Sequence, residues 1–158
     1  MKTSFKTGLS FGLTSGVITT LGLMVGLHSG THSRTVVVGG IVTIAVADAL
    51  SDALGIHIAE ESRNNGNVSE VWESTIATFM AKFVIALTFV VPVLLLPLEV
   101  AMMVSVGWGL ALLAGLSFLL ARAQQIPAWK VIAEHVVIGV SVVAITHYVG
   151  GWIHSALS

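Results

Sequence analysis

The chain has 158 residues, of which 55% are hydrophobic and 9% charged, and its mean hydropathy is +0.95. Soluble domains carry about 25% charged residues, so this composition predicts one all-α domain (residues 1–158) embedded in a lipid bilayer. A net charge of −1 gives no electrostatic footprint for nucleic acid, and the lack of cysteine excludes disulfides and thiolate metal sites.

Five apolar segments are each long enough to cross the hydrocarbon core, which takes about 20 helical residues. We expect these spans at about residues 8–28, 36–58, 76–96, 100–121 and 130–153. Short polar loops at residues 28–35, 64–74 and 122–129 separate them, and Glu99 lies in a very short turn. The pattern predicts a polytopic membrane protein with five transmembrane helices.

The first span is interrupted by glycines and small polar residues, which are typical of helix–helix contact faces in membranes. Ser15 and Thr19 are expected to line either a transport path or such a contact face. Lys2 and Lys6 ahead of the span also fit the start of a signal peptide. The long apolar run without an Ala-x-Ala-like cleavage site favours a retained helix instead.

The second span contains two acidic residues, Asp48 and Asp52, four positions apart. That spacing places both side chains on one helix face. Counting about 1.5 Å of rise per residue from Val36, Asp48 lies roughly 18 Å and Asp52 roughly 24 Å along the span. Acidic groups are expensive at such depth, so by default they indicate a functional site.

Carboxylate oxygens suit hard or borderline divalent cations such as Mn²⁺, Mg²⁺ and Fe²⁺. Two neighbouring acids in a low dielectric should not both be charged without a cation, so Asp48 and Asp52 predict a metal site that exchanges protons for metal. The alternative is that both acids merely hold helices together by hydrogen bonds to threonines of the first span.

Three polar residues follow at the end of the second span: His57, Glu60 and Glu61. They are expected either to attract a cation at a cytoplasmic mouth or to form a solvated helix end. In the third span, Lys82 is expected near the start, where a long side chain can reach the interface. Pro92 should kink that span, and Pro97 should end it or lie in the turn.

Orientation is predicted from the basic residues, which favour the cytoplasmic side. Arg34 alone falls on one side, next to His28, His32, His147 and His154. These histidines form either a pH-sensitive exit or a chance grouping. The other side holds Lys2, Lys6, Arg63, Lys82, Arg122 and Lys130. The amino terminus is therefore expected in the cytoplasm and the carboxyl terminus outside, with the cell membrane favoured over an organelle.

The first span reads Thr-Ser-Gly-Val-Ile-Thr-Thr-Leu over residues 14–21, and the second reads Ala-Asp-Ala-Leu-Ser over residues 47–51. In this order the two motifs resemble those of the vacuolar iron transporter family. The family has a pattern like N-D-G-I-V-T-T-F in its first helix and A-D-A-I-S-M-G-x-G-E-Y in its second. The resemblance implies five helices, a cytosolic amino terminus and a homodimer with the metal path between the first two helices of both subunits.

The chain departs from that pattern at several ligand positions. Ser15 stands where the family has aspartate, Asp52 replaces methionine, and Ile56 and His57 replace the Glu-Tyr pair. The family's cytoplasmic metal-binding insert between spans two and three is absent from this sequence. Asp48 is the one ligand that the resemblance carries over directly.

The function expected from these residues and the resemblance is proton-coupled export of a divalent cation such as Fe²⁺ or Mn²⁺, with Asp48 and Asp52 as ligands and no permanently bound cofactor. The alternative is a non-transporting scaffold or partner subunit that keeps the fold. Because the sequence has no Walker motif and no nucleophile–base arrangement, an enzyme is not expected.

Overall fold

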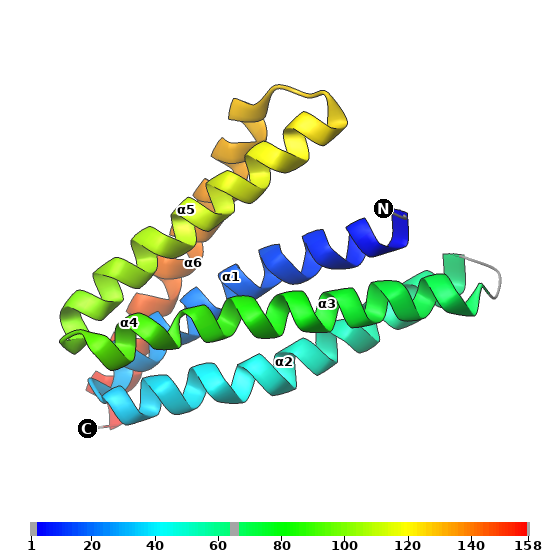
Figure 1. The fold of residues 1–158 in the computed structure, drawn as a ribbon. Coiled ribbons are helices and arrows are strands. Elements are labelled where there is room, and N and C mark those ends of the chain that lie inside the picture. Colours follow the sequence, from blue (N-terminus) through cyan, green and yellow to red (C-terminus); the bar gives the residue numbers. More distant parts are fainter. Residues whose placement is uncertain (1–2, 64–66, 158) are drawn as a thin grey trace.

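A computed structural model describes residues 3–63 and 67–157. Over these residues the chain is all-helical, and five helices are long and apolar enough to cross a membrane (Figure 1). This confirms the predicted all-α class with five candidate spans. The helices are α1 (Thr3–Thr31), α2 (Arg34–Arg63), α3 (Val68–Thr88), α4 (Val90–Leu95), α5 (Leu98–Gln124) and α6 (Ala128–Leu157).

The helices extend well beyond the predicted apolar spans, so the predicted loops were too long. The connection between α1 and α2 is residues 32–33 alone, and His32 adopts a left-handed φ of 51° there. Residues 68–74, predicted as loop, form the first turns of α3, while residues 64–66 of that predicted loop lie outside the described residues. The reason is that hydropathy marks the apolar core, whereas backbone hydrogen bonding carries a helix on into the polar interface.

The third span is interrupted one turn before Pro92, between α3 and α4. Phe89 ends α3, and its backbone N–H bonds Ala86 rather than continuing the α-helical pattern. Proline has no N–H and its ring crowds the carbonyl four residues earlier, here that of Thr88. The predicted kink is therefore present, and Pro97 caps the start of α5 in the turn, as expected.

Helix α1 is the centre of the bundle. It packs against α3, α6, α2 and α5, while α1, α2 and α3 run side by side and the α5–α6 pair leans away from them (Figure 1). The core lies along α1, where Val17, Leu21 and Met24 are fully buried. They pack with Ile41, Phe89 and Leu113 from neighbouring helices.

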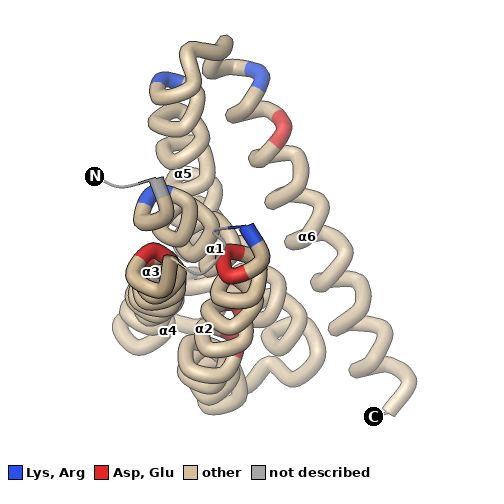
Figure 2. The backbone as a smooth tube through the Cα atoms, turned by 90° about the vertical axis from the view of Figure 1, so that its right-hand side faces the viewer, with Lys and Arg blue, Asp and Glu red and all other residues tan. Residues whose placement is uncertain are grey.

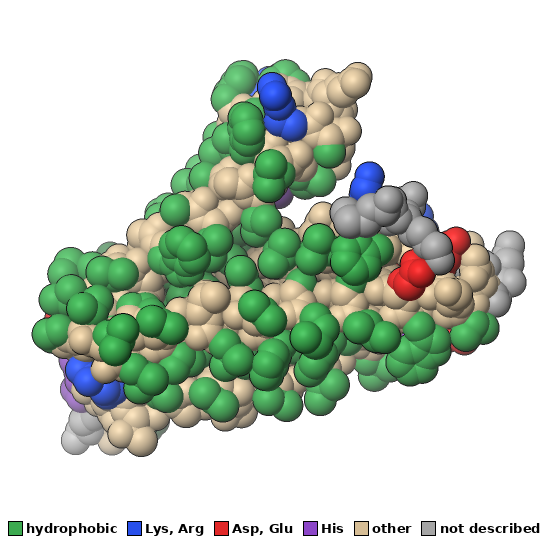
Figure 3. Space-filling view, viewed as in Figure 1, with side chains coloured by type: hydrophobic (Ala, Val, Ile, Leu, Met, Phe, Trp, Pro, Cys, Tyr) green, Lys and Arg blue, Asp and Glu red, His purple; other side chains and the backbone are tan. Residues whose placement is uncertain are grey.

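Apolar side chains are spread along the whole length of the visible face (Figure 3), and many large apolar residues are exposed. Tyr148 and Trp152 are strongly exposed near the end of α6, and such aromatic residues are typical of membrane–water interfaces. Charged residues gather towards helix ends (Figure 2). Five helices long and apolar enough to cross a bilayer, together with exposed apolar side chains, are consistent with an integral membrane protein.

Candidate functional site

Lys82 is the residue whose position differs most from prediction. Because α3 begins at Val68, Lys82 lies deep inside the helix rather than near its start. Its side chain does not reach the interface; only 2% of it is exposed. The expectation that Lys82 extends to the membrane surface was wrong, since it rested on placing the start of the third span too late.

Lys82 turns inward to the predicted acidic pair. Its Nζ lies 2.6 Å from Asp48 Oδ2 and pairs directly with Asp52 Oδ2. The ammonium also donates to Ser15 Oγ at 2.9 Å, and that hydroxyl donates to Asp52 Oδ2 at 2.6 Å. A cation is thus held by three oxygens that come from α1 and α2.

The register of these helices follows from polar residues spaced four apart. On α3, Ser74, Thr78 and Lys82 are all buried and share one face. Thr78 Oγ1 donates to the Gly8 carbonyl of α1 at 3.1 Å, which fixes the height of α3 against α1. The same four-residue spacing on α2 presents both acids to Lys82.

The Asp48–Lys82–Asp52 site has two acidic side chains and only one basic side chain. With both carboxylates and the amine charged, one negative charge remains. An ammonium removed from water needs such partners, because an unpaired buried charge costs several kcal/mol or more. Asp48 is the member with most solvent access, since 31% of its side chain is exposed against 21% for Asp52.

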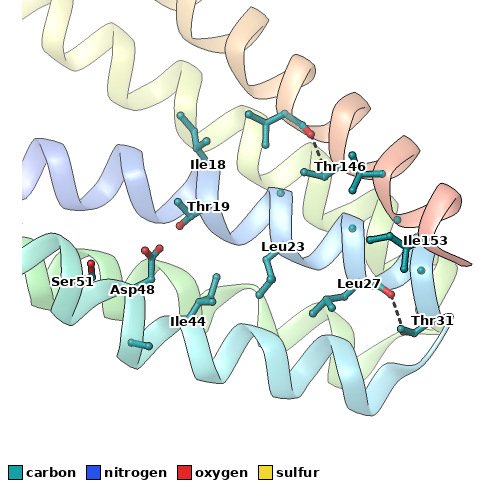
Figure 4. A pocket seen from close by; sticks show the side chains of 17 residues that line it. Ile18, Thr19, Leu23, Leu27, Thr31, Ile44, Asp48, Ser51, Thr146 and Ile153 are labelled. Atoms are coloured by element: carbon teal, nitrogen blue, oxygen red, sulfur yellow. Dashed lines mark hydrogen bonds between the residues drawn. The ribbon is translucent and has the colours of Figure 1, made fainter. Parts of the chain in front are cut away.

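A groove of about 900 Å³ begins beside Asp48 and runs between α1, α2 and α6 (Figure 4). Thr19 and Ser51 line it near Asp48, while Thr31 and Ile153 line its other end. The Thr19 hydroxyl donates to the Ser15 carbonyl of its own helix at 3.0 Å. Of the two predicted lining residues, Ser15 therefore belongs to the charged site and Thr19 to the groove.

The predicted mouth residues are not brought together. His57 faces α3, where its Nδ1 lies 3.0 Å from Thr75 Oγ1 and its ring packs on Trp72. Glu60 is buried and pairs with Arg63 at 2.9 Å. Glu61, the next residue of α2, is exposed. These contacts are those of a structured helix end.

Three of the four predicted exit histidines do converge. The rings of His28 and His32 lie 5.4 Å apart, and those of His32 and His154 lie 5.5 Å apart. His28 Nε2 also lies 3.1 Å from Glu99 Oε1. His147 is turned elsewhere and contacts the Ser29 hydroxyl. The four-residue spacing of His28 and His32 is visible in the sequence, whereas the approach of His154 from α6 depends on how the helices pack.

Among the described residues, no three histidine or acidic side chains are placed to hold a metal ion together. The predicted pair Asp48 and Asp52 instead shares a lysine. An arrangement of two carboxylates, a hydroxyl and an amine can hold a cation, and it can bind or release protons at the amine and the acids.

No protein family, curated protein or solved structure was found to match the chain.

Proposed function

We propose that the protein is a proton-coupled transporter of divalent cations, with Asp48 and Asp52 as the ligands and Lys82 as an internal cation that the substrate displaces. One observation carries this proposal: the Lys82 ammonium sits among three oxygens inside an apolar bundle. A place that holds one cation in low dielectric is suited to hold another, and intramembrane ionisable groups mark ion pathways and proton relays.

The charges balance if the metal takes the place of one proton. The site carries −1 with Lys82 protonated, and it becomes neutral when M²⁺ binds between both carboxylates and a neutral amine. Binding then releases one proton from Lys82. Lysine suits this role because its amine can exist with or without the extra proton, whereas the guanidinium of arginine stays protonated in proteins.

The oxygen-rich donor set favours hard or borderline ions such as Mn²⁺ and Fe²⁺, in agreement with the resemblance to vacuolar iron transporters. The three oxygens around Lys82 belong to a single chain, so this mechanism does not depend on the predicted homodimer. With the amino terminus in the cytoplasm, the proposed direction is export in exchange for incoming protons.

The test is metal flux in liposomes that contain a metal-sensitive dye and a pH dye, under an imposed proton gradient. We expect Mn²⁺ or Fe²⁺ flux with opposite proton flow, and at least a tenfold loss in Asp48→Asn and in Asp52→Asn. Glu134→Gln is the matched control, because Glu134 is an exposed acid on α6 away from the site, and it should leave flux unchanged. Metal flux that ignores both aspartate substitutions would contradict the proposed site.

A scaffold or partner subunit is the second candidate, and the same ion pair favours it. Lys82 already neutralises one carboxylate charge, and the described residues offer no third acidic or histidine ligand. In that case the site would hold α1, α2 and α3 together, and liposomes would show no flux for Fe²⁺, Mn²⁺, Co²⁺ or Zn²⁺.

A further inference from the structure

The groove beside Asp48 has the features of a ligand site with a single charged end. Its volume of about 900 Å³ lies within the roughly 300–1,000 Å³ of small-molecule sites. Asp48 is the one charged residue that lines it. In Figure 4 its carboxylate points from α2 towards α1, at one end of the groove. The other wall residues are aliphatic, glycine or hydroxyl side chains.

The charge of a ligand that fits this groove follows from the net charge of the Asp48–Lys82–Asp52 site, which is −1. Lys82 offsets one of two carboxylates, and its own side chain is almost fully buried away from the groove, whereas Asp48 keeps part of its side chain exposed. The groove therefore meets the negative member of the pair. Low-dielectric surroundings strengthen its attraction for a positive group.

The aliphatic side chains that line the groove favour a ligand whose uncharged part is apolar. Leu23, Leu27 and Ile44 line the length of the groove, as labelled in Figure 4. A hydrated metal ion would lose its water along these aliphatic side chains and gain only a few hydroxyl contacts in return, which is costly. An organic cation with an apolar body instead buries its own apolar surface there, which is favourable.

We propose that this groove binds amphipathic organic cations, with the positive group beside Asp48 and the apolar body along α1, α2 and α6. Such binding is separate from the proposed metal transport, because it needs no movement of any ion across the membrane. A lipid acyl chain fits the walls but leaves the net negative charge of the Asp48–Lys82–Asp52 site unbalanced. A second copy of the chain would bring another net negative site to the same place, which charge complementarity disfavours.

Equilibrium binding of tetraphenylphosphonium to the full chain in lipid nanodiscs tests this inference. Tetraphenylborate is the matched probe, since it has nearly the same size and shape but the opposite charge. We expect saturable binding of the phosphonium at about one per chain and no saturable binding of the borate. Asp48→Asn should weaken phosphonium binding at least tenfold, whereas Asp48→Glu keeps the charge and should retain it.

A second pair of variants separates the groove from the charge. Gly26 lines the groove, and a Cβ there meets only ordinary contacts with Thr146, so Gly26→Leu should fold and fill the cavity. We expect at least a tenfold loss of affinity. Gly39→Leu is the control, because Gly39 lies on α2 outside the groove and a Cβ there meets open space.

Several results would overturn the inference. Equal, unsaturable uptake of both probes would mean partition into lipid, and affinity unaffected by Asp48→Asn or by Gly26→Leu would exclude this groove. Phosphonium binding that is absent while the protein crosslinks as a dimer through α1 and α6 would assign the groove to a second copy. Because binding is measured without a gradient, failure of metal flux leaves this test intact, and the reverse also holds.

Discussion

Lys82 connects three helices through one ammonium group. Oxygen atoms of Ser15, Asp48 and Asp52 all lie within hydrogen-bonding distance of Lys82 Nζ. Such buried ion pairs do not by themselves guarantee stability, because desolvation can exceed the Coulombic gain. Removing only one partner is different, since it leaves an uncompensated charge in the bundle.

Lys82→Met tests this asymmetry. The substitution keeps side-chain length but leaves two carboxylates without a cation, and we expect a loss of about 3–5 kcal/mol in unfolding free energy. Adding Asp48→Asn and Asp52→Asn to the same chain removes the charges and should restore most of that loss. Unfolding in mixed micelles titrated with a denaturing detergent, followed by helical circular dichroism, measures both. Equal stability of the single variant and the unaltered chain would mean that the pairs contribute nothing.

The acidic half of the site could be predicted from sequence, but its basic half could not. Asp48 and Asp52 stand out because acids are rare in apolar helices and share a face at four-residue spacing. Lys82 was assigned to the interface because the polar stretch before it read as loop. The sequence did contain a signal for it, because Ser74, Thr78 and Lys82 repeat the same four-residue spacing. In the structure all three are buried.

Helix α1 approaches α3 so closely that two of its positions tolerate no side chain. A Cβ at Gly8 would lie 2.2 Å from the Ser74 carbonyl oxygen, and one at Gly12 would lie 2.5 Å from the Thr78 carbonyl oxygen. Small residues allow such backbone contact in membranes, where it supplies much of the packing energy. The same closeness brings Ser15 within reach of Lys82.

Gly12→Ala should therefore push α1 away from α3. We expect a loss of about 1–3 kcal/mol in unfolding free energy, as for other overpacked contacts. Gly55→Ala is the matched control, since a Cβ there meets open space in the middle of α2. It should be neutral or more stable by about 0.5–1 kcal/mol, because alanine favours helix over glycine. Detergent-induced unfolding compares the two, and equal effects would argue against the close contact.

Element order and the break near Pro92 could be predicted, because apolar length and proline chemistry are local properties. Helix ends could not, since residues 68–74 contain two serines and two glutamates yet form part of α3. The lean of the α5–α6 pair away from α1 also has no local signal. It arises from packing between side chains that are far apart in sequence.

The whole molecule has an uneven distribution of basic residues. With Lys82 moved into the bundle, Arg34 remains alone at the α1–α2 connection, where it donates to the Leu96 carbonyl at 2.8 Å. The opposite helix ends carry Lys6, Arg63, Arg122 and Lys130, and the predicted contribution of Lys2 lies outside the described residues. Among the described residues the bias therefore persists at four to one, and it still favours a cytoplasmic amino terminus.

Single-cysteine labelling tests this orientation cleanly, because the chain has no native cysteine. Gln124 at the end of α5 and Ser155 near the end of α6 are both exposed and lie at opposite ends of the α5–α6 pair. In right-side-out vesicles, a membrane-impermeant maleimide should label Ser155→Cys directly and Gln124→Cys only after permeabilisation. The cysteine-free chain is the control for background. Labelling of Gln124→Cys in intact vesicles would reverse the orientation, and with it the proposed direction of export.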